Sequence, residues 1–337
     1  MNTKANFDRR QVTTGLATGL AAALTLPLSV RLPGARALAE TATATGTGPW
    51  HELAELSQKA QRLGLSVPRM SLSASAAGDA FNETMPAVVD FMDSVQASAR
   101  DASQVSSSEV DTLLERASEI LRAARNAERV PRDVGGPGAA AVTAPAFETI
   151  ADDYRRLFAT CTITESKRSE VMWYVGKATD AERRKAYEQV YEETCAPWYF
   201  VAITHGMEGS FDMKAHLHNG DSLKNKTVQV PAGRPDPWNP PSDWVSSAVD
   251  AMKVDKFEEK ADWDLAKVLY RWEAYNGWRS RLQHGINTPY LWSYSNHYTK
   301  GKFVADGVWD GSAVSKQCGA AVMLKALVET GAIAPPA

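Results

Sequence analysis

The chain has 337 residues, which is more than one average domain and fewer than three. Hydrophobic residues make up 44% of it and charged residues 23%, as in ordinary globular proteins. The formal net charge of −3 offers no excess of positive charge to attract nucleic acid or an acidic membrane surface. Neither is therefore expected as a partner.

The first 39 residues have the layout of a secretion signal. Arg9 and Arg10 form a twin-arginine pair, an apolar stretch covers residues 15–30, and residues 37–39 form a small-x-small cleavage pattern. The alternative is a membrane anchor, but the apolar stretch is shorter than the ~20 residues of a spanning helix. Pro27 also interrupts it. We expect a periplasmic or secreted protein that meets a membrane only during export.

Residues 40–146 are rich in Ala and Ser and predict a helical region with linkers. Ser106 and Glu109 form a capping box, which predicts the start of a helix. A linker with several Pro and Gly residues, 131–145, separates this region from the rest of the chain. The apolar residues after the capping box follow one helical face, which indicates packing: Val110, Leu113, Leu114, Ala117, Ile120, Leu121 and Ala124.

Residues 147–337 predict a second domain that is mainly α-helical. The best strand signal covers residues 226–230, after the turn residues Asn219, Gly220 and Asp221, and it predicts a small β-hairpin. Helical spacing and capping residues predict helices over 146–159, 180–195, from Pro197 to about 206–209, from Ser242 onward, over 265–276 and over 314–328.

Three cysteines follow the signal: Cys161, Cys195 and Cys318. Their spacing fits no metal-binding knuckle. An oxidising compartment would permit one disulfide and leave one thiol. The alternative is that they are small buried residues.

Glu208 is the first candidate for chemistry because it ends an apolar helix, one turn after Thr204 and His205. The negative end of the helix dipole and the aromatic surroundings both favour a protonated carboxyl. A carboxyl that stays protonated near neutral pH can donate its proton to a leaving glycosidic oxygen. The alternative is an ordinary solvated Glu at a helix end.

A second carboxylate, Asp221, follows thirteen positions later. It could face Glu208 across a cleft and direct a water molecule to the sugar, as the base does in inverting glycosidases. Its alternative role is to form the turn on which it lies. Asp212 is a weaker candidate for the same base, and the hydroxyl of Thr227 could help to hold the water. We therefore expect Glu208, Asp221 and Thr227 to be the catalytic residues.

His205, His216 and His218 suggest a different chemistry, that of a zinc-dependent wall amidase. A catalytic zinc site usually has three protein ligands, but the chain has no His-Glu-x-x-His pattern. The other interpretation is that these histidines bond the loop backbone and shape a cleft. We expect no metal and no other cofactor.

Residues 287–298 alternate aromatic side chains with amides and hydroxyls, without helical spacing. Sugar rings stack their C–H faces on aromatic rings and direct their hydroxyls to amides, so this segment suits a saccharide groove. The alternative is a packed loop over the core. Glu273 is expected to be structural, paired with Arg271, Arg279 or Arg281.

The motifs around these candidates occur together along the second domain, in residues 197–208, 216–221, 227–235, 273–277, 295–298 and 313–319. As a set they resemble the bacterial and phage "lysozyme family protein" group of peptidoglycan hydrolases, over roughly residues 147–329. The resemblance implies a lysozyme-like fold, with a Glu at the end of a core helix and a hairpin lining the cleft. It implies Glu208 as the acid and, by analogy of order and spacing, Asp221 as the second carboxylate. The chain departs from the family's usual pattern in having Gly209, where Ser often follows the acid.

The residues and the resemblance together predict a muramidase-like glycosidase that cleaves β-1,4 bonds of peptidoglycan or a related amino-sugar polymer. Two alternatives stay open: a lytic transglycosylase, which requires no second carboxylate, and a non-catalytic peptidoglycan-binding protein. The residues expected to contact the substrate are His205, His216, His218, Asn219, Arg234, Tyr275, Tyr290, Trp292, Tyr294, Asn296, His297 and Tyr298.

Overall fold

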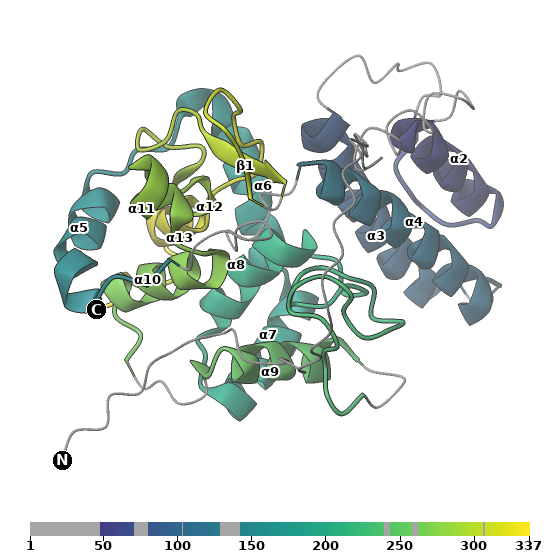
Figure 1. The fold of residues 1–337 in the computed structure, drawn as a ribbon. Coiled ribbons are helices and arrows are strands. Elements are labelled where there is room, and N and C mark those ends of the chain that lie inside the picture. Colours follow the sequence, from purple (N-terminus) through teal and green to yellow (C-terminus); the bar gives the residue numbers. More distant parts are fainter. Residues whose placement is uncertain are drawn as a thin grey trace, which may run out of the picture. The chain divides into compact units, whose positions relative to one another are not determined.

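Helices dominate this computed structural model, as the sequence predicts (Figure 1). The structure describes residues 48–70, 80–102, 104–128, 142–238, 243–257, 262–305 and 307–337. The predicted secretion signal lies outside these residues. No helix among the described residues is long and apolar enough to cross a membrane. The helices are α2 (Pro49–Arg62), α3 (Ala80–Asp101), α4 (Ser107–Glu128), α5 (Phe147–Ala159), α6 (Arg168–Ala178), α7 (Ala181–Thr194), α8 (Trp198–Gly209), α9 (Trp244–Val254), α10 (Leu265–Asn276), α11 (Arg279–His284), α12 (Pro289–Trp292) and α13 (Ala320–Glu329), with a short 3₁₀ helix, η1 (Glu165–Lys167).

Among the described residues before 129, the helices α2, α3 and α4 pack against one another. The predicted capping box is present at the start of α4, where Glu109 N donates to Ser106 Oγ at 3.2 Å and Ser106 N donates to Glu109 Oε2 at 3.0 Å. Each side chain thus satisfies a backbone donor that has no partner within the helix. The predicted apolar face of α4 is buried from Leu113 to Ala124, while Val110 is half-buried.

α8 lies among α6, α7 and α13 and is apolar on every side. All ten residues from Phe200 to Gly209 are buried, as expected of a helix without a polar face. The ring of Phe200 stacks on Trp272 of α10 with centroids 5.0 Å apart, and Trp272 Nε1 donates to Thr204 Oγ1 at 3.1 Å. α8 is therefore held by the core, and its C-terminal end has a defined position.

Residues 226–230 do not form the predicted hairpin, so this prediction is wrong. Val228 and Val230 are 79% and 51% exposed, so these residues have no apolar layer to pack against. The amides of Val228 and Gln229 donate to the Asp221 carboxylate, at 2.8 and 2.9 Å, in place of a neighbouring strand. The two-stranded sheet of the described chain lies elsewhere and is antiparallel, with β1 (Lys302–Ala305) paired to β2 (Val308–Asp310).

The described helices on both sides of residues 131–145 belong to one compact unit, Thr47–Ala337. Asp93 of α3, for example, pairs with Arg183 of α7. The domain boundary after residue 146 stays a prediction. All three cysteines are free thiols; Cys161 and Cys318 are buried and Cys195 is exposed.

Candidate active site

Glu208 lies at the C-terminal end of α8, where the sequence predicts the acid, and only 5% of it is exposed. Its Oε1 accepts a hydrogen bond from the hydroxyl of Tyr290 at 2.9 Å. Tyr290 comes from α12, and Gln317 Nε2 donates to the carbonyl of Met207 at 2.7 Å. Residues far apart in the sequence thus hold both the side chain and the adjacent backbone.

The backbone reverses directly after Glu208. Ser210 and Phe211 have φ of 52° and 62°, and this turn directs the chain back over α8. Gly206 and Gly209 make room for it, because a Cβ on Gly206 would lie 2.6 Å from Phe211 Cζ and one on Gly209 would lie 2.9 Å from His205 Cδ2. A side chain at position 209 would therefore collide with the His205 ring.

The turn at residues 219–221 contacts the end of α8. A Cβ on Gly220 would lie under 3 Å from the carbonyl oxygen of Glu208, and the φ of Gly220 is +75°. Only glycine combines this backbone conformation with this close approach. Glu208 and the Asp221 turn, thirteen residues apart in the sequence, are therefore neighbours in space.

Asp221 has a turn-forming role in this structure. Its Oδ2 accepts from the amides of Val228 and Gln229, and its Oδ1 accepts from Gln229 Nε2 at 3.1 Å. Three donors thus hold the carboxylate, which is 6% exposed. The base role predicted for Asp221 would require a water molecule to share these oxygens.

Thr227 and Arg234 close the same loop. The Thr227 hydroxyl donates to Pro231 O at 2.5 Å and accepts from Arg234 N at 2.9 Å. Arg234 Nε donates to Asp250 of α9 at 2.9 Å, and His218 Nε2 lies 2.7 Å from the same carboxylate. These side chains anchor the loop to α9, so the water-holding role predicted for Thr227 competes with a structural one.

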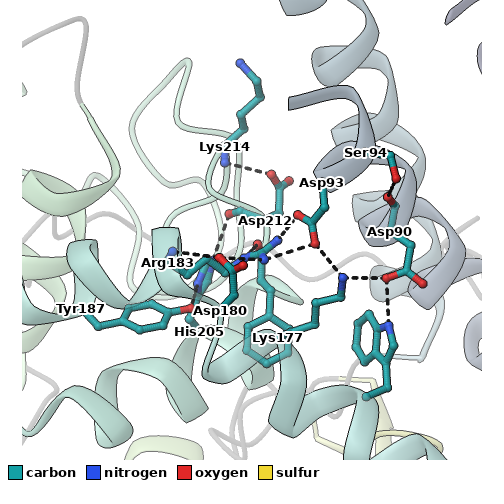
Figure 2. Close-up of polar contacts among 12 residues, drawn as sticks. Asp90, Asp93, Ser94, Lys177, Asp180, Arg183, Tyr187, His205, Asp212 and Lys214 are labelled. Atoms are coloured by element: carbon teal, nitrogen blue, oxygen red, sulfur yellow. Dashed lines mark hydrogen bonds and ion pairs between the residues drawn. The ribbon is translucent and has the colours of Figure 1, made fainter. Parts of the chain in front are cut away.

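His205 is fully buried, and the substrate contact predicted for it stays a prediction. Its Nδ1 lies 3.0 Å from the hydroxyl of Tyr187 and its Nε2 lies 3.1 Å from Asp212 O (Figure 2). Burial lowers the pKa of His205 to about 3, which keeps the ring neutral. Because a carbonyl oxygen only accepts, Nε2 carries the proton and Nδ1 accepts from Tyr187.

His216 and His218 are also buried, at 0% and 1% exposure, so they do not offer the predicted groove wall. Both ring nitrogens of His216 are engaged, with Ser247 Oγ and Asn225 O at 2.7 Å each. Burial lowers the pKa of His216. Among the described residues, no group of three or more His, Cys, Asp or Glu side chains could hold a metal ion. The bonds of His205 to Asp212 O and of His216 to Asn225 O support the backbone-bonding interpretation for these two histidines.

The aromatic segment packs inward, contrary to the predicted groove. Residues 289–292 form α12, and Trp292 is 0% exposed. Tyr294 is 7% exposed and donates to Glu170 at 2.8 Å, and the hydroxyl of Tyr298 accepts from Ser315 N at 3.0 Å. These polar tips are satisfied inside the chain, which is what buried tyrosines require.

The other predicted contacts divide between loop support and surface. Tyr275 is 2% exposed and donates to the carbonyls of Leu217 and His218 at 2.9 and 3.2 Å, so it supports the loop from below. Asn219 is buried and donates to Gln229 O at 3.0 Å. Asn296 is exposed and His297 half-buried, and both bond Thr160, the first through its backbone carbonyl and the second through its hydroxyl.

Sequence reasoning missed the contribution of α4 to this region. Ser118 Oγ donates to Asp212 Oδ2 at 2.5 Å, and Arg125 donates to the carbonyl of Gly220. Both side chains are buried, at 0% and 2% exposure. Buried polar residues inside an otherwise apolar helical stripe were the available signal, because such groups require partners.

Because His205 is buried as a neutral ring, we expect the protein to become less stable in acid. Its folded pKa of about 3 lies below its ordinary 6.5, so between these values the unfolded chain binds the proton more readily. The free energy of unfolding therefore falls as pH drops through this window, by about 1.4 kcal/mol per unit. The parent protein should lose free energy of unfolding between about pH 7 and about pH 4.5. We expect His205→Gln to make this loss smaller by about 3 kcal/mol.

Urea denaturation at the two pH values measures this difference. His51→Gln is the control, because His51 lies at the surface of α2 beside Glu55. An unchanged pH dependence in His205→Gln would contradict the prediction.

Comparison with protein-family models, with curated proteins and with solved structures found no match to this chain.

Proposed function

We propose that this chain is a lysozyme-like glycosidase that cleaves β-1,4 bonds of peptidoglycan, with Glu208 as general acid. The observation that carries the proposal is the position of Glu208 in the last turn of a buried helix, where its carboxyl accepts from Tyr290 and its backbone carbonyl lies against the 219–221 turn. A carboxyl of low exposure at a helix C-terminus is suited to protonating a leaving oxygen. The tyrosine hydroxyl orients it, as a positioned general acid requires.

Mass spectrometry of products from purified sacculi tests the proposal. We expect the chain to release soluble disaccharide-peptide fragments without added metal. Intact sacculi after prolonged incubation would contradict it. Binding to sacculi without release would favour a non-catalytic wall-binding protein.

Lytic transglycosylation is the second candidate, and the state of Asp221 favours it. In that reaction the sugar's own hydroxyl attacks, so no second carboxylate is required, and in this structure Asp221 is occupied by three donors. Products with anhydro ends lack one water and so differ in mass from hydrolysis products.

Asp221→Asn separates the two reactions. If Asp221 is the base of a hydrolase, we expect turnover to fall about 10²-fold or more, the contribution of a general base. If the reaction is transglycosylation, most of the turnover should remain. The melting temperature of each protein must also be measured. The substitution removes the charge that accepts from the amides of Val228 and Gln229, which can lower the free energy of unfolding by about 1–3 kcal/mol. Gln229→Ala, which removes one donor to Asp221 and leaves its charge, is the control for loop loosening.

A further inference from the structure

The turn after Glu208 is strained. We call residues 209–212 the site turn. Two consecutive non-glycine residues in it, Ser210 and Phe211, have positive φ. Residues other than glycine hold this conformation only where surrounding contacts impose it, and such strain concentrates at functional sites. The contacts that hold the site turn therefore also decide how the end of α8 presents Glu208.

One group of contacts reaches the site turn through α7. Arg183 Nε donates to the carbonyl of Phe211 at 3.2 Å, and Arg183 also pairs with Asp93 of α3 at 2.5 Å (Figure 2). Burial alone would lower the pKa of Arg183, but the Asp93 carboxylate raises it overall. Lys177 of α6 lies 2.6 Å from both Asp93 and Asp90. Asp93 of α3 is thus connected through Arg183 to the carbonyl of Phe211 in the site turn.

A second group comes directly from α4. Glu115 and Ser118 are three positions apart and so share one face of the helix. Ser118 Oγ donates to Asp212 Oδ2 at 2.5 Å, and the same carboxylate accepts from Lys214 N at 2.8 Å. Glu115 pairs with the ammonium of Lys214 at 3.1 Å. Both ends of the segment 212–214 are therefore bonded to α4.

A third contact lies beside the acid itself. Arg125, seven positions after Ser118 on the same helix, donates to the carbonyl of Gly220. A Cβ on Gly220 would lie under 3 Å from both the Arg125 guanidinium carbon and the Glu208 carbonyl oxygen. The guanidinium, the turn and the end of α8 meet at this point.

We propose that α3 and α4 form a positioning clamp that completes the active site by holding the site turn. This inference rests on the proposed function of Glu208. Asp93, Glu115, Ser118 and Arg125 are positioning residues, because they act on the site turn, on the adjacent Lys214 or on the 219–221 turn, and not on the substrate. α3 and α4 thereby contribute to catalysis. A separate module that only binds the cell wall would not contribute to it.

The double variant Glu115→Gln/Ser118→Ala tests the clamp by removing one charge and one hydroxyl without introducing bulk. Its matched control is Glu119→Gln, since Glu119 pairs with Arg116 on another face of the same helix at 2.8 Å. On dye-labelled sacculi we expect kcat to fall roughly ten- to a hundredfold, the effect of a misplaced catalytic group, with KM unchanged. Amide exchange in the peptide covering residues 209–214 should rise, while Glu119→Gln should match the parent in both measurements.

The outcomes separate the clamp from its alternatives. A double variant as fast as the parent overturns the inference, and a faster one shows that α4 is an inhibitory cover. If the double variant does not fold, Glu115→Gln alone decides, because this side chain is 28% exposed and its replacement leaves no cavity. Failure of the proposed function looks different: Glu208→Gln would then digest sacculi like the parent, whatever the exchange data show.

Discussion

Glu208→Gln is expected to reduce the release of glycan fragments from sacculi by about 10²–10⁴-fold, the contribution of a positioned general acid. Glutamine has the size of glutamic acid and still offers an oxygen to the Tyr290 hydroxyl, which lies 2.9 Å from Oε1. The variant should therefore keep its fold and lose only the proton that the leaving oxygen requires. Fragment release measured by mass spectrometry, with the melting temperature as a check, gives the result.

Glu170→Gln is the matched control for this experiment. Glu170 of α6 accepts from the Tyr294 hydroxyl at 2.8 Å, so it is also a glutamate held by a tyrosine of the segment 289–298. It should retain the activity of the parent. If Glu208→Gln digests sacculi as fast as the parent, the general-acid mechanism is wrong.

Gly220→Ala is expected to destabilise the fold by roughly 3–5 kcal/mol, from left-handed strain and from overpacking. The added methyl group would meet the Glu208 carbonyl oxygen and the Arg125 guanidinium, both closer than 3 Å. The Glu208 oxygen belongs to the backbone of a buried helix and cannot move aside cheaply. Because the same collision displaces Glu208, turnover on sacculi should fall as well.

Gly233→Ala separates strain from collision. Gly233 lies in the same loop with a φ of +78°, close to the +75° of Gly220, but a Cβ there has nothing within 4 Å. Its replacement should cost only the left-handed strain, about 1–2 kcal/mol. Denaturation in urea compares the two variants, and equal losses would show that the Gly220 turn does not press on α8.

Local signals in the sequence were reliable where a few neighbouring residues determine the outcome. The Ser106–Glu109 capping box starts α4 as predicted, and the helix predicted over 265–276 is α10, which Gly277 follows with a φ of +124°. Such signals work because a cap satisfies helix-end groups with side chains only a few positions away. The predicted ion pair of Glu273 is confirmed with Arg281, at 2.9 Å.

Predictions were less accurate for residue patterns whose structure depends on partners far away in the sequence. Residues 226–230 alternate like a strand, yet the Asp221 carboxylate captures the amides of Val228 and Gln229, so no ladder forms. The aromatic residues after Pro289 suit a sugar groove by composition. In the structure they pack into the core instead, and Trp292 is fully buried. Composition cannot distinguish a groove wall from a core when both use the same side chains.

The amino-acid sequence alone was enough to predict that the described chain is mainly helical, that an apolar helix ends close to Glu208, where α4 begins and that its apolar face from Leu113 to Ala124 is buried. The surroundings of the Glu208 carboxyl follow from the packing of distant parts of the chain. Tyr290 reaches Glu208 from 82 residues away, and Ser118 reaches Asp212 from 94. No local spacing encodes such pairings, because they depend on how whole helices pack, and packing is settled by the summed burial of many side chains.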